Sequence, residues 1–194
     1  MNRRADCITG IVLWLGLAVA VPGFDLIHTN VFELASGETL ANETWLGAGR
    51  ITLNGEARDD VFLLAGADRT APASSNGVIT LAGDCRDDVW ALADRVEIGG
   101  RAGGHVRAAA RTVRVTGEIG KGALLMGSAV SLAPESHLAG TARLIGENLV
   151  AEGCVEGRLT LLGNKVTLSG SFSNDVRVTA QDVVVLPGTR IGGD

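Results

Sequence analysis

The sequence predicts an all-β fold, a single-stranded parallel β-solenoid with three faces and eight coils of about 17 residues each. Apolar and polar residues alternate in bursts of three to five, as in "VRAAARTVRVTGEIGKG" (106–122), and alternation with period two marks a strand with one buried face. Bursts this short do not fit hairpin strands. No stretch after residue 25 sustains a helical spacing of apolar residues over three turns.

The repeat covers nearly all of the chain after Thr44. Units start at 89, 106 and 123, and again at 142, 159 and 176, so most have 17 residues and two have two more. A first unit spans 44–60, and residues 61–88 form one unit with 11 additional residues. We predict that these residues form an inserted loop at 67–77, because Pro, Ser, Asn and Gly gather there without alternation.

Equivalent positions of the units are apolar and are expected to line one core. Stacking at the interstrand spacing of about 4.8 Å would align them in columns. The predicted interior includes Val113, Leu125, Leu149 and Val166. Glycines such as Gly83 and Gly117 recur at predicted corners, where the chain needs a positive φ or a close approach of two backbones.

The residues before the repeats have the features of an export leader. Arg3 and Arg4 precede an apolar run over 8–21, and Ala-Val-Ala at 18–20 is a pattern that suits signal peptidase. The run is shorter than the about 20 residues that a spanning helix needs. A signal peptide cleaved after Ala20 is the preferred interpretation, and retention as an N-terminal membrane anchor is the alternative.

The predicted domain organisation follows from this leader. Residues 1–20 are the signal peptide or anchor, 21–43 a lead-in and N-terminal cap, and 44–194 the solenoid. Either fate of the leader implies an exported protein, periplasmic or associated with the membrane outside the cytoplasm. Cys85 and Cys154 are expected in one inward column, roughly 19 Å apart, which is too far for a disulfide and predicts buried free thiols.

Composition offers little for catalysis or nucleic-acid binding. The net charge is −5 and the pI about 5.2, and no basic stripe is visible along the sequence, which argues against a nucleic-acid partner. Tyr is absent and His occurs three times. We therefore predict no catalytic residue, no cofactor, no nucleotide and no metal ion.

Two groups of polar residues were weighed as sites. Asp59, Asp60, Asp87 and Asp88 stand at equivalent ends of adjacent units. Turn formation is favoured there over a catalytic or calcium site, because Asp bonds its own backbone in turns. His105 and His137 are interpreted as solvated turn residues, with no carboxylate expected at a matching position.

An exposed apolar surface is predicted on the outward side of the first face of the coils. Such a patch marks an interface. We expect it to contact another subunit, or the membrane if the leader is retained, with Trp45, Phe62 and Trp90 as anchors. The predicted interface residues are Trp45, Phe62, Leu64, Trp90, Leu92, Leu124, Met126, Ile145 and Leu162. A fold of the inserted loop over the three aromatic rings is the alternative.

The cadence of "ASGETLANETWLGAGRITLNGEARDDVFLLAG" (35–66) and of "VRVTAQDVVVLPGTRIGGD" (176–194) resembles the bactofilins, the polymer-forming cytoskeletal proteins of bacteria. The resemblance covers residues 35–194. It implies a right-handed, three-faced β-helix that assembles end to end without a nucleotide, usually at a membrane. Typical bactofilins are cytoplasmic, whereas this chain has an export-type leader, so it is closer to exported relatives.

The expected function is that of a non-enzymatic, self-assembling structural scaffold of the bacterial cell envelope. The expected partner is the protein itself, with the membrane or an envelope protein or glycan as further partners. Two alternatives remain open, an exported binding module and a carbohydrate-acting enzyme of the envelope. An enzyme of this kind would need clustered carboxylates or basic residues on one outer face.

Overall fold

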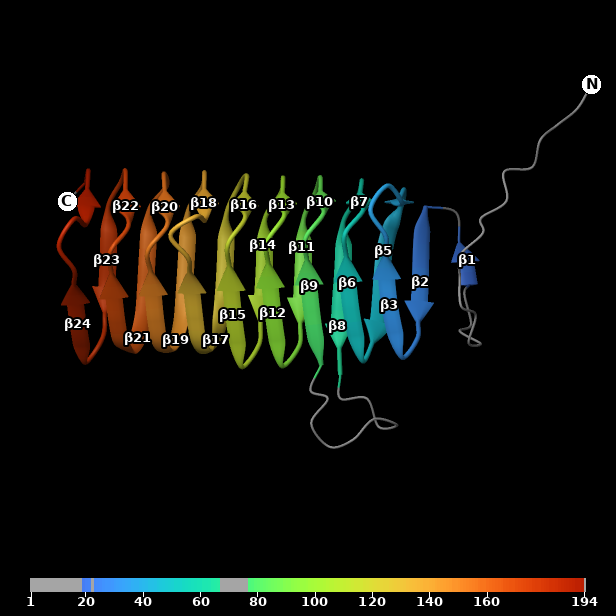
Figure 1. Ribbon diagram of the computed structural model, residues 1–194, viewed down its shortest axis with the longest axis horizontal. Helices are drawn as coiled ribbons and strands as arrows, with labels where there is room; N and C mark the ends of the chain where they lie inside the picture. Colours follow the sequence, from blue (N-terminus) through green and yellow to red (C-terminus); the bar gives the residue numbers. More distant parts are fainter. Residues whose placement is uncertain (1–18, 22, 67–76, 194) are drawn as a thin grey trace, which may run out of the picture.

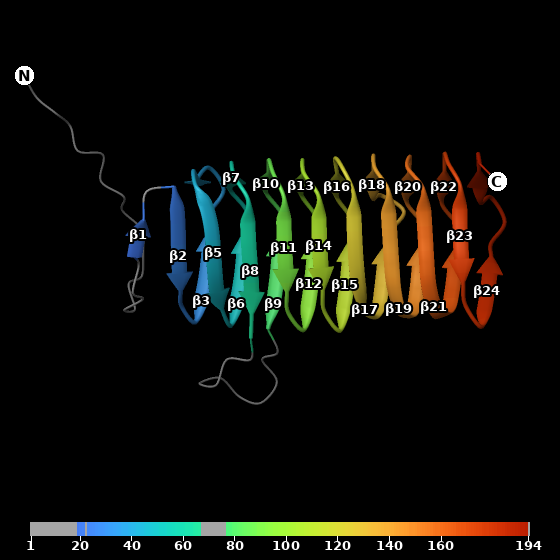
Figure 2. The same cartoon turned by 180° about the vertical axis from the view of Figure 1, so that it is seen from behind.

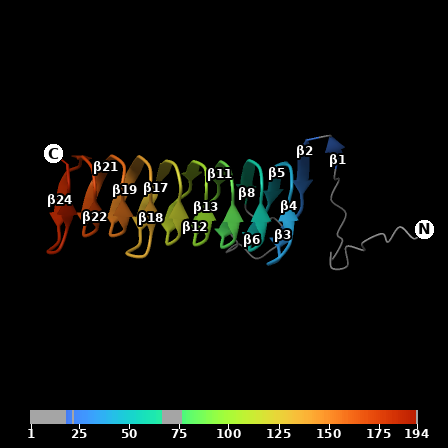
Figure 3. The ribbon, with the colours of Figure 1, turned by 90° about the horizontal axis from the view of Figure 1, so that it is seen from above.

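The computed structural model describes residues 19–21, 23–66 and 77–193 and confirms the parallel β-solenoid. All of its regular elements are strands, and they form about nine turns that repeat roughly every 17 residues. Figure 1 and the reverse view in Figure 2 show a rod in which the turns follow one another from β2 to β24. The view from above in Figure 3 shows the same succession along the rod.

Each turn contributes one strand to each of three faces. The first face contains β2 (Phe24–His28), β5 (Glu43–Ala48), β8 (Val61–Ala65), β11 (Val89–Leu92), β14 (Val106–Ala109) and β23 (Val176–Thr179). The second face contains β3 (Val31–Leu34), β6 (Arg50–Leu53), β9 (Val78–Leu81), β12 (Arg95–Ile98), β15 (Thr112–Val115) and β24 (Asp182–Val185). Three longer strands run through both faces: β17 (Ala123–Leu132), β19 (Ala142–Ala151) and β21 (Leu159–Leu168).

The third face is a separate sheet of nine very short strands. These are β4 (Thr39–Leu40), β7 (Glu56–Ala57), β10 (Asp84–Cys85), β13 (Arg101–Ala102), β16 (Glu118–Ile119), β18 (His137–Leu138), β20 (Cys154–Val155), β22 (Ser171–Phe172) and β25 (Arg190–Ile191). Each pairs in parallel with the equivalent strand of the neighbouring turn. A two-residue strand suffices here, because its neighbours on both sides extend the ladder.

The core consists of the inward columns that the repeat predicts. Val113, Leu125 and Val166 are fully buried and Leu149 is 1 % exposed, which confirms the predicted interior. Equivalent residues are paired in register, for example Val89 with Val106. Each inward side chain therefore contacts its counterparts above and below, and no turn buries its apolar residues alone.

The corners between the second and third faces explain the glycines. A Cβ on Gly83 would overlap the carbonyl oxygen of Gly55, and a Cβ on Gly117 would overlap that of Gly100. Neither glycine has a positive φ. Of the two predicted reasons for glycine, the close approach of backbones therefore applies at these corners.

The two longer units place their additional residues at this same corner. In the turn after β17, the Ser136 hydroxyl donates to the Ala133 carbonyl at 2.7 Å, and in the turn before β25 the Thr189 hydroxyl donates to the Leu186 carbonyl at 2.7 Å. The hydroxyl contacts close a small turn without shifting the strands that follow. Leu138 accordingly remains in register with Ile119.

The solenoid begins one turn earlier than the sequence indicated. Residues 24–40, within the predicted lead-in and N-terminal cap at 21–43, contain β2, β3 and β4, and these pair in parallel with β5, β6 and β7. The repeat was hidden there because Asp25 and Thr44 take the column held by Val61, and because this turn also has 19 residues, from Phe24 to the start of β5. β1 (Val19–Val21) pairs with β2 in the antiparallel sense.

Two sequence predictions fall outside the described residues. The inserted loop predicted at 67–77 lies almost wholly in 67–76, between the end of β8 and the start of β9. Most of the predicted leader, residues 1–18, also lies outside them. In the described part of the chain, no helix is long and apolar enough to cross a membrane.

Candidate interaction face

The predicted interface residues occupy two parallel columns on the outward side of the first face. The first column, which we call the mixed column, runs through Trp45, Phe62, Trp90, Arg107, Leu124, Arg143, Thr160 and Arg177. The second, the aliphatic column, runs through Leu64, Leu92, Ala109, Met126, Ile145 and Leu162. The structure thus places the predicted residues on one face, in two columns of different composition.

The aromatic residues of the mixed column stack on one another. The ring centroids of Trp45 and Phe62 are 4.2 Å apart with nearly parallel planes, and those of Phe62 and Trp90 are 5.8 Å apart. The Arg107 guanidinium carbon lies 4.4 Å from the Trp90 ring centroid, a cation–π contact. Trp45 and Trp90 remain 43 % and 42 % exposed. Since the ring faces cover each other, a partner would meet mainly their edges.

The aliphatic column is the more continuous apolar surface. Leu64 and Leu92 are each 54 % exposed, and Met126, Ile145 and Leu162 are 40 %, 38 % and 49 % exposed. These side chains follow one another on successive turns, apart from the smaller Ala109. The assignment of this face as an interface stays a prediction.

The second half of the mixed column is basic, which corrects one expectation from the sequence. No basic stripe was visible along the chain, but Arg107, Arg143 and Arg177 lie in one outward column on alternate turns. They are 36 and 34 residues apart in the sequence. Only the stacking of turns brings them together.

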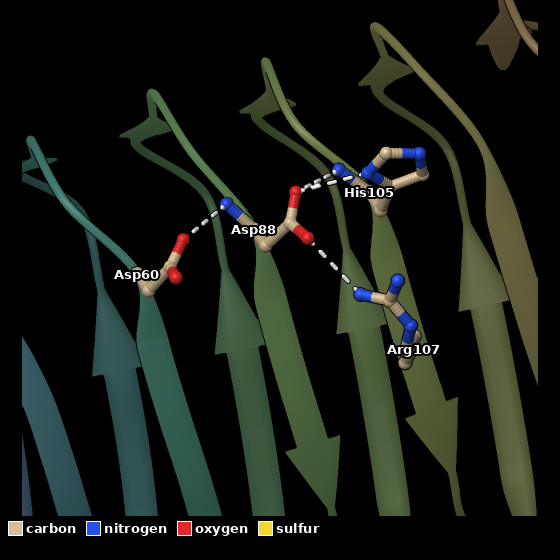
Figure 4. A network of polar contacts seen from close by, with 4 residues as sticks. All are labelled: Asp60, Asp88, His105 and Arg107. Atoms are coloured by element: carbon tan, nitrogen blue, oxygen red, sulfur yellow. Dashed lines mark hydrogen bonds and ion pairs between the residues drawn. The ribbon is translucent and has the colours of Figure 1, made fainter.

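A polar network connects three successive corners, each of which directly precedes a strand of the first face (Figure 4). The Asp60 carboxylate accepts a hydrogen bond from the Asp88 backbone N–H at 3.0 Å, and Asp88 accepts one from the His105 N–H at 2.7 Å. Asp88 also lies 3.1 Å from His105 Nδ1 and accepts a bond from Arg107 at 3.0 Å. Each carboxylate therefore fixes the backbone of the following turn.

These contacts determine the acidity of Asp88. Partial burial alone would raise the pKa of its carboxyl, but the His105 backbone N–H, the Arg107 guanidinium and the His105 ring together lower that pKa to about 2. A carboxylate held ionised in this way is unsuited to general acid or base catalysis near neutral pH. Its role in the geometry is to hold neighbouring turns together.

The Asp cluster has the contacts of turn residues. Asp59 accepts a hydrogen bond from the Asp60 backbone N–H at 2.9 Å, and Asp60 accepts from Asp88 as described. No group of three or more His, Cys, Asp or Glu side chains placed to hold a metal ion occurs among the residues that the structure describes. The geometry thus supports the interpretation as turns.

The histidines and one cysteine differ from expectation. His105 faces Asp88, and His137 Nε2 lies 3.2 Å from Glu156 Oε1, so both have a carboxylate across the neighbouring turn. Cys85 is buried, and burial raises the pKa of its thiol to about 12. Cys154 is not in the same inward column, because it aligns with His137 and Ser171, and it is only half-buried. Both thiols are free.

No protein-family model, curated protein or solved structure matches the chain. The resemblance to bactofilins therefore rests on the repeat pattern in the sequence. What the fold contributes is a rod with periodic side faces and two ends that differ from each other.

Proposed function

We propose that the protein is a non-enzymatic, self-assembling scaffold of the bacterial cell envelope, bactofilin-like in its architecture, in which solenoids join end to end. The observation that carries this proposal is the apolar end of the rod at β23, β24 and β25. Val183 and Val185 align with the buried Val166 and Leu168 of the preceding turn, yet they are 48 % and 56 % exposed. They belong to the core columns, but within the described residues no further turn covers them.

The opposite end offers strands of the same direction. β3 and β4 each pair on one side only, with β6 and β7, in the part of the chain that the structure describes. Phe32 and Leu40 there are only partly buried against the core. A second copy that places its β3 and β4 beside β24 and β25 would continue the second and third faces and their columns, whereas β1 already pairs with β2 at the edge of the first face. Open strand edges favour such pairing unless they are covered.

The test compares three positions of β24, of which Val183 and Val185 lie in the core columns and Val184 points outward. Lys at Val183 or Val185 would place a charge between two stacked copies, whereas Lys at Val184 points outward, where Val184 is already 41 % exposed in the single molecule. We expect the purified protein to form elongated assemblies in electron micrographs. Val183→Lys and Val185→Lys should remain monomeric in light scattering, and Val184→Lys should assemble like the unchanged protein.

The same variants also serve as a control for correct folding. Because Val183 and Val185 face solvent in the isolated rod, Lys there should leave the far-ultraviolet circular dichroism of the monomer unaltered. A protein that stays monomeric at all concentrations would refute the proposal. Equal assembly of all three variants would refute the end-to-end geometry.

A further inference from the structure

Two adjoining depressions lie along the corners at which the chain passes from the third face to the first face. One, of about 720 Å³, is lined by residues of three successive turns, among them Thr141, Arg143, Arg158 and Arg177. The other, of about 570 Å³, is lined by residues that include Arg107, Lys121 and again Thr141 and Arg143. Because they share Thr141 and Arg143, the two form one open groove along the rod axis, which we call the corner groove.

The corner groove is basic although the whole chain carries a net charge of −5. No Asp or Glu lines either depression. Arg107 and Arg158 are engaged by Asp88 and Asp175. Lys121, Arg143 and Arg177 have no ion pair with any residue that the structure describes. Three exposed cations are thus left to face the groove, where an anion from outside the molecule can pair with them.

The remaining lining is polar in the first depression and partly apolar in the second, where Val106, Ala123 and Leu124 contribute. Thr141, Thr160 and Asn174 supply hydroxyl and amide groups, which can both donate and accept hydrogen bonds. Gly157 and Gly140 stand at the corner between Lys121 and Asn174, and a Cβ on either would overlap the backbone of the preceding turn. Glycine at these positions therefore permits the close approach of neighbouring turns at this corner.

The spacing of the charges indicates an extended ligand. Arg107, Arg143 and Arg177 stand on alternate turns, which places them roughly 10 Å apart along the rod. That is about the length of one disaccharide in a linear polysaccharide. No Phe or Trp lines the groove. Among its lining residues only His105 has an aromatic ring, so the series of stacking platforms on which proteins that bind single-stranded nucleic acid depend is missing.

We propose that the corner groove binds a linear acidic polysaccharide along the rod axis, with carboxylates of its uronic-acid-like units paired to Arg143 and Arg177. Arginine suits this role because its guanidinium bonds a carboxylate in a bidentate manner. Thr141, Thr160 and Asn174 bond the sugar hydroxyls. The groove lies on the side of the rod, so a single molecule binds the ligand without assembling end to end.

The probe is an oligogalacturonate, titrated by calorimetry into the monomeric Val183→Lys protein at low ionic strength. Arg143→Glu and Arg177→Glu should each weaken binding at least roughly tenfold, the effect of losing a charge-assisted hydrogen bond and adding a repulsion. Arg143→Lys should retain part of the affinity. The matched control is Arg114→Glu, an exposed outward arginine on the second face, which should bind within about twofold of the parent.

Three further ligands decide between chemical classes. A neutral maltooligosaccharide of equal length should not bind, and the uronate affinity should fall as salt is added. Failure of the oligogalacturonate to bind, or an equal loss in Arg114→Glu and Arg143→Glu, would overturn the proposal. Tighter binding of a single-stranded oligonucleotide, or of vesicles with anionic lipid, would also overturn it and would assign the groove to that ligand instead. None of these outcomes affects the test of end-to-end assembly.

Discussion

At the scale of single residues, the position of a residue within its turn decides which side chains it can carry. The corner column of Gly83, Gly100 and Gly117 allows no Cβ, because each glycine lies against the backbone of the turn before it. Most inward positions hold apolar side chains, since they are covered from both sides, and the buried Thr44 hydroxyl is satisfied by the Asn42 carbonyl. Outward positions are free, and the protein uses that freedom for rings, aliphatic groups and charges.

We predict that Gly117→Ala destabilises the solenoid and that Gly66→Ala does not. A Cβ on Gly117 would overlap the carbonyl oxygen of Gly100, so neighbouring turns must move apart, at a cost of about 1–3 kcal/mol. A Cβ on Gly66 would meet open space, and Gly66 has no positive φ. Gly66→Ala should therefore change the free energy of unfolding by no more than about 0.5 kcal/mol. Urea denaturation of both variants measures the difference. Equal stability of the two would contradict the corner geometry.

The lowered pKa of Asp88 predicts that this carboxylate stabilises the fold in a pH-dependent manner. Its folded pKa of about 2 lies below the value of about 4 expected in the unfolded chain, so the contribution is present above about pH 4 and is lost as the pH falls toward 2. Asp88→Asn should lower the free energy of unfolding by about 1–2 kcal/mol at pH 7, and the difference should vanish near pH 2. Asp87→Asn, at the neighbouring exposed carboxylate, is the control. A difference independent of pH would assign the effect to packing rather than charge.

At the scale of strands and turns, much of the fold could be predicted because the repeat aligns chemically equal residues. Val89, Val106 and Ala123 recur at a spacing of 17, and the structure pairs them in register. The first turn escaped prediction, since Asp25 breaks the apolar column and the turn has a different length. Cys154 was assigned to the wrong side for a related reason, because a shift by one residue in a two-residue strand reverses its orientation.

The surfaces were less predictable than the core. The outward apolar residues were found from the sequence, but the stacking of Trp45, Phe62 and Trp90 depends on ring orientations that no repeat specifies. The basic column was missed because charge was considered along the chain. In a solenoid, neighbouring positions on a face are a whole turn apart, so charge must be counted down the columns. Counting every second turn would have revealed Arg143 and Arg177.

At the scale of the whole molecule, the two ends are expected to be less stable than the middle. Each internal turn is paired on both sides, whereas β24 and β25 pair only with β21 and β22 among the described strands. Repeat proteins open from such ends, because each repeat is stabilised mainly by its neighbours. The order of opening along the rod therefore follows from the topology alone.

We predict that backbone amides of β24 exchange with deuterium faster than those of β19 in the dilute protein. On raising the concentration, β24 amides should become protected if copies join end to end, while Val183→Lys should show no such gain. Mass spectrometry of deuterated peptides measures both effects. Protection of β24 equal to that of β19 in the dilute monomer would show that the end is already covered.

In-register stacking also limits which insertions and deletions the molecule can tolerate. Removing residues 106–122 would join His105 to Ala123 and place Ala123 beside Val89, with every column intact and the rod one step shorter. Removing a single residue from within a strand would instead turn the side chains after it to the wrong side until the next corner. Only the corners accept small additions, as those before Ser136 and Thr189 do. The rod can thus be lengthened or shortened by whole turns. A longer or shorter rod would keep the same three faces and differ only in how far they extend.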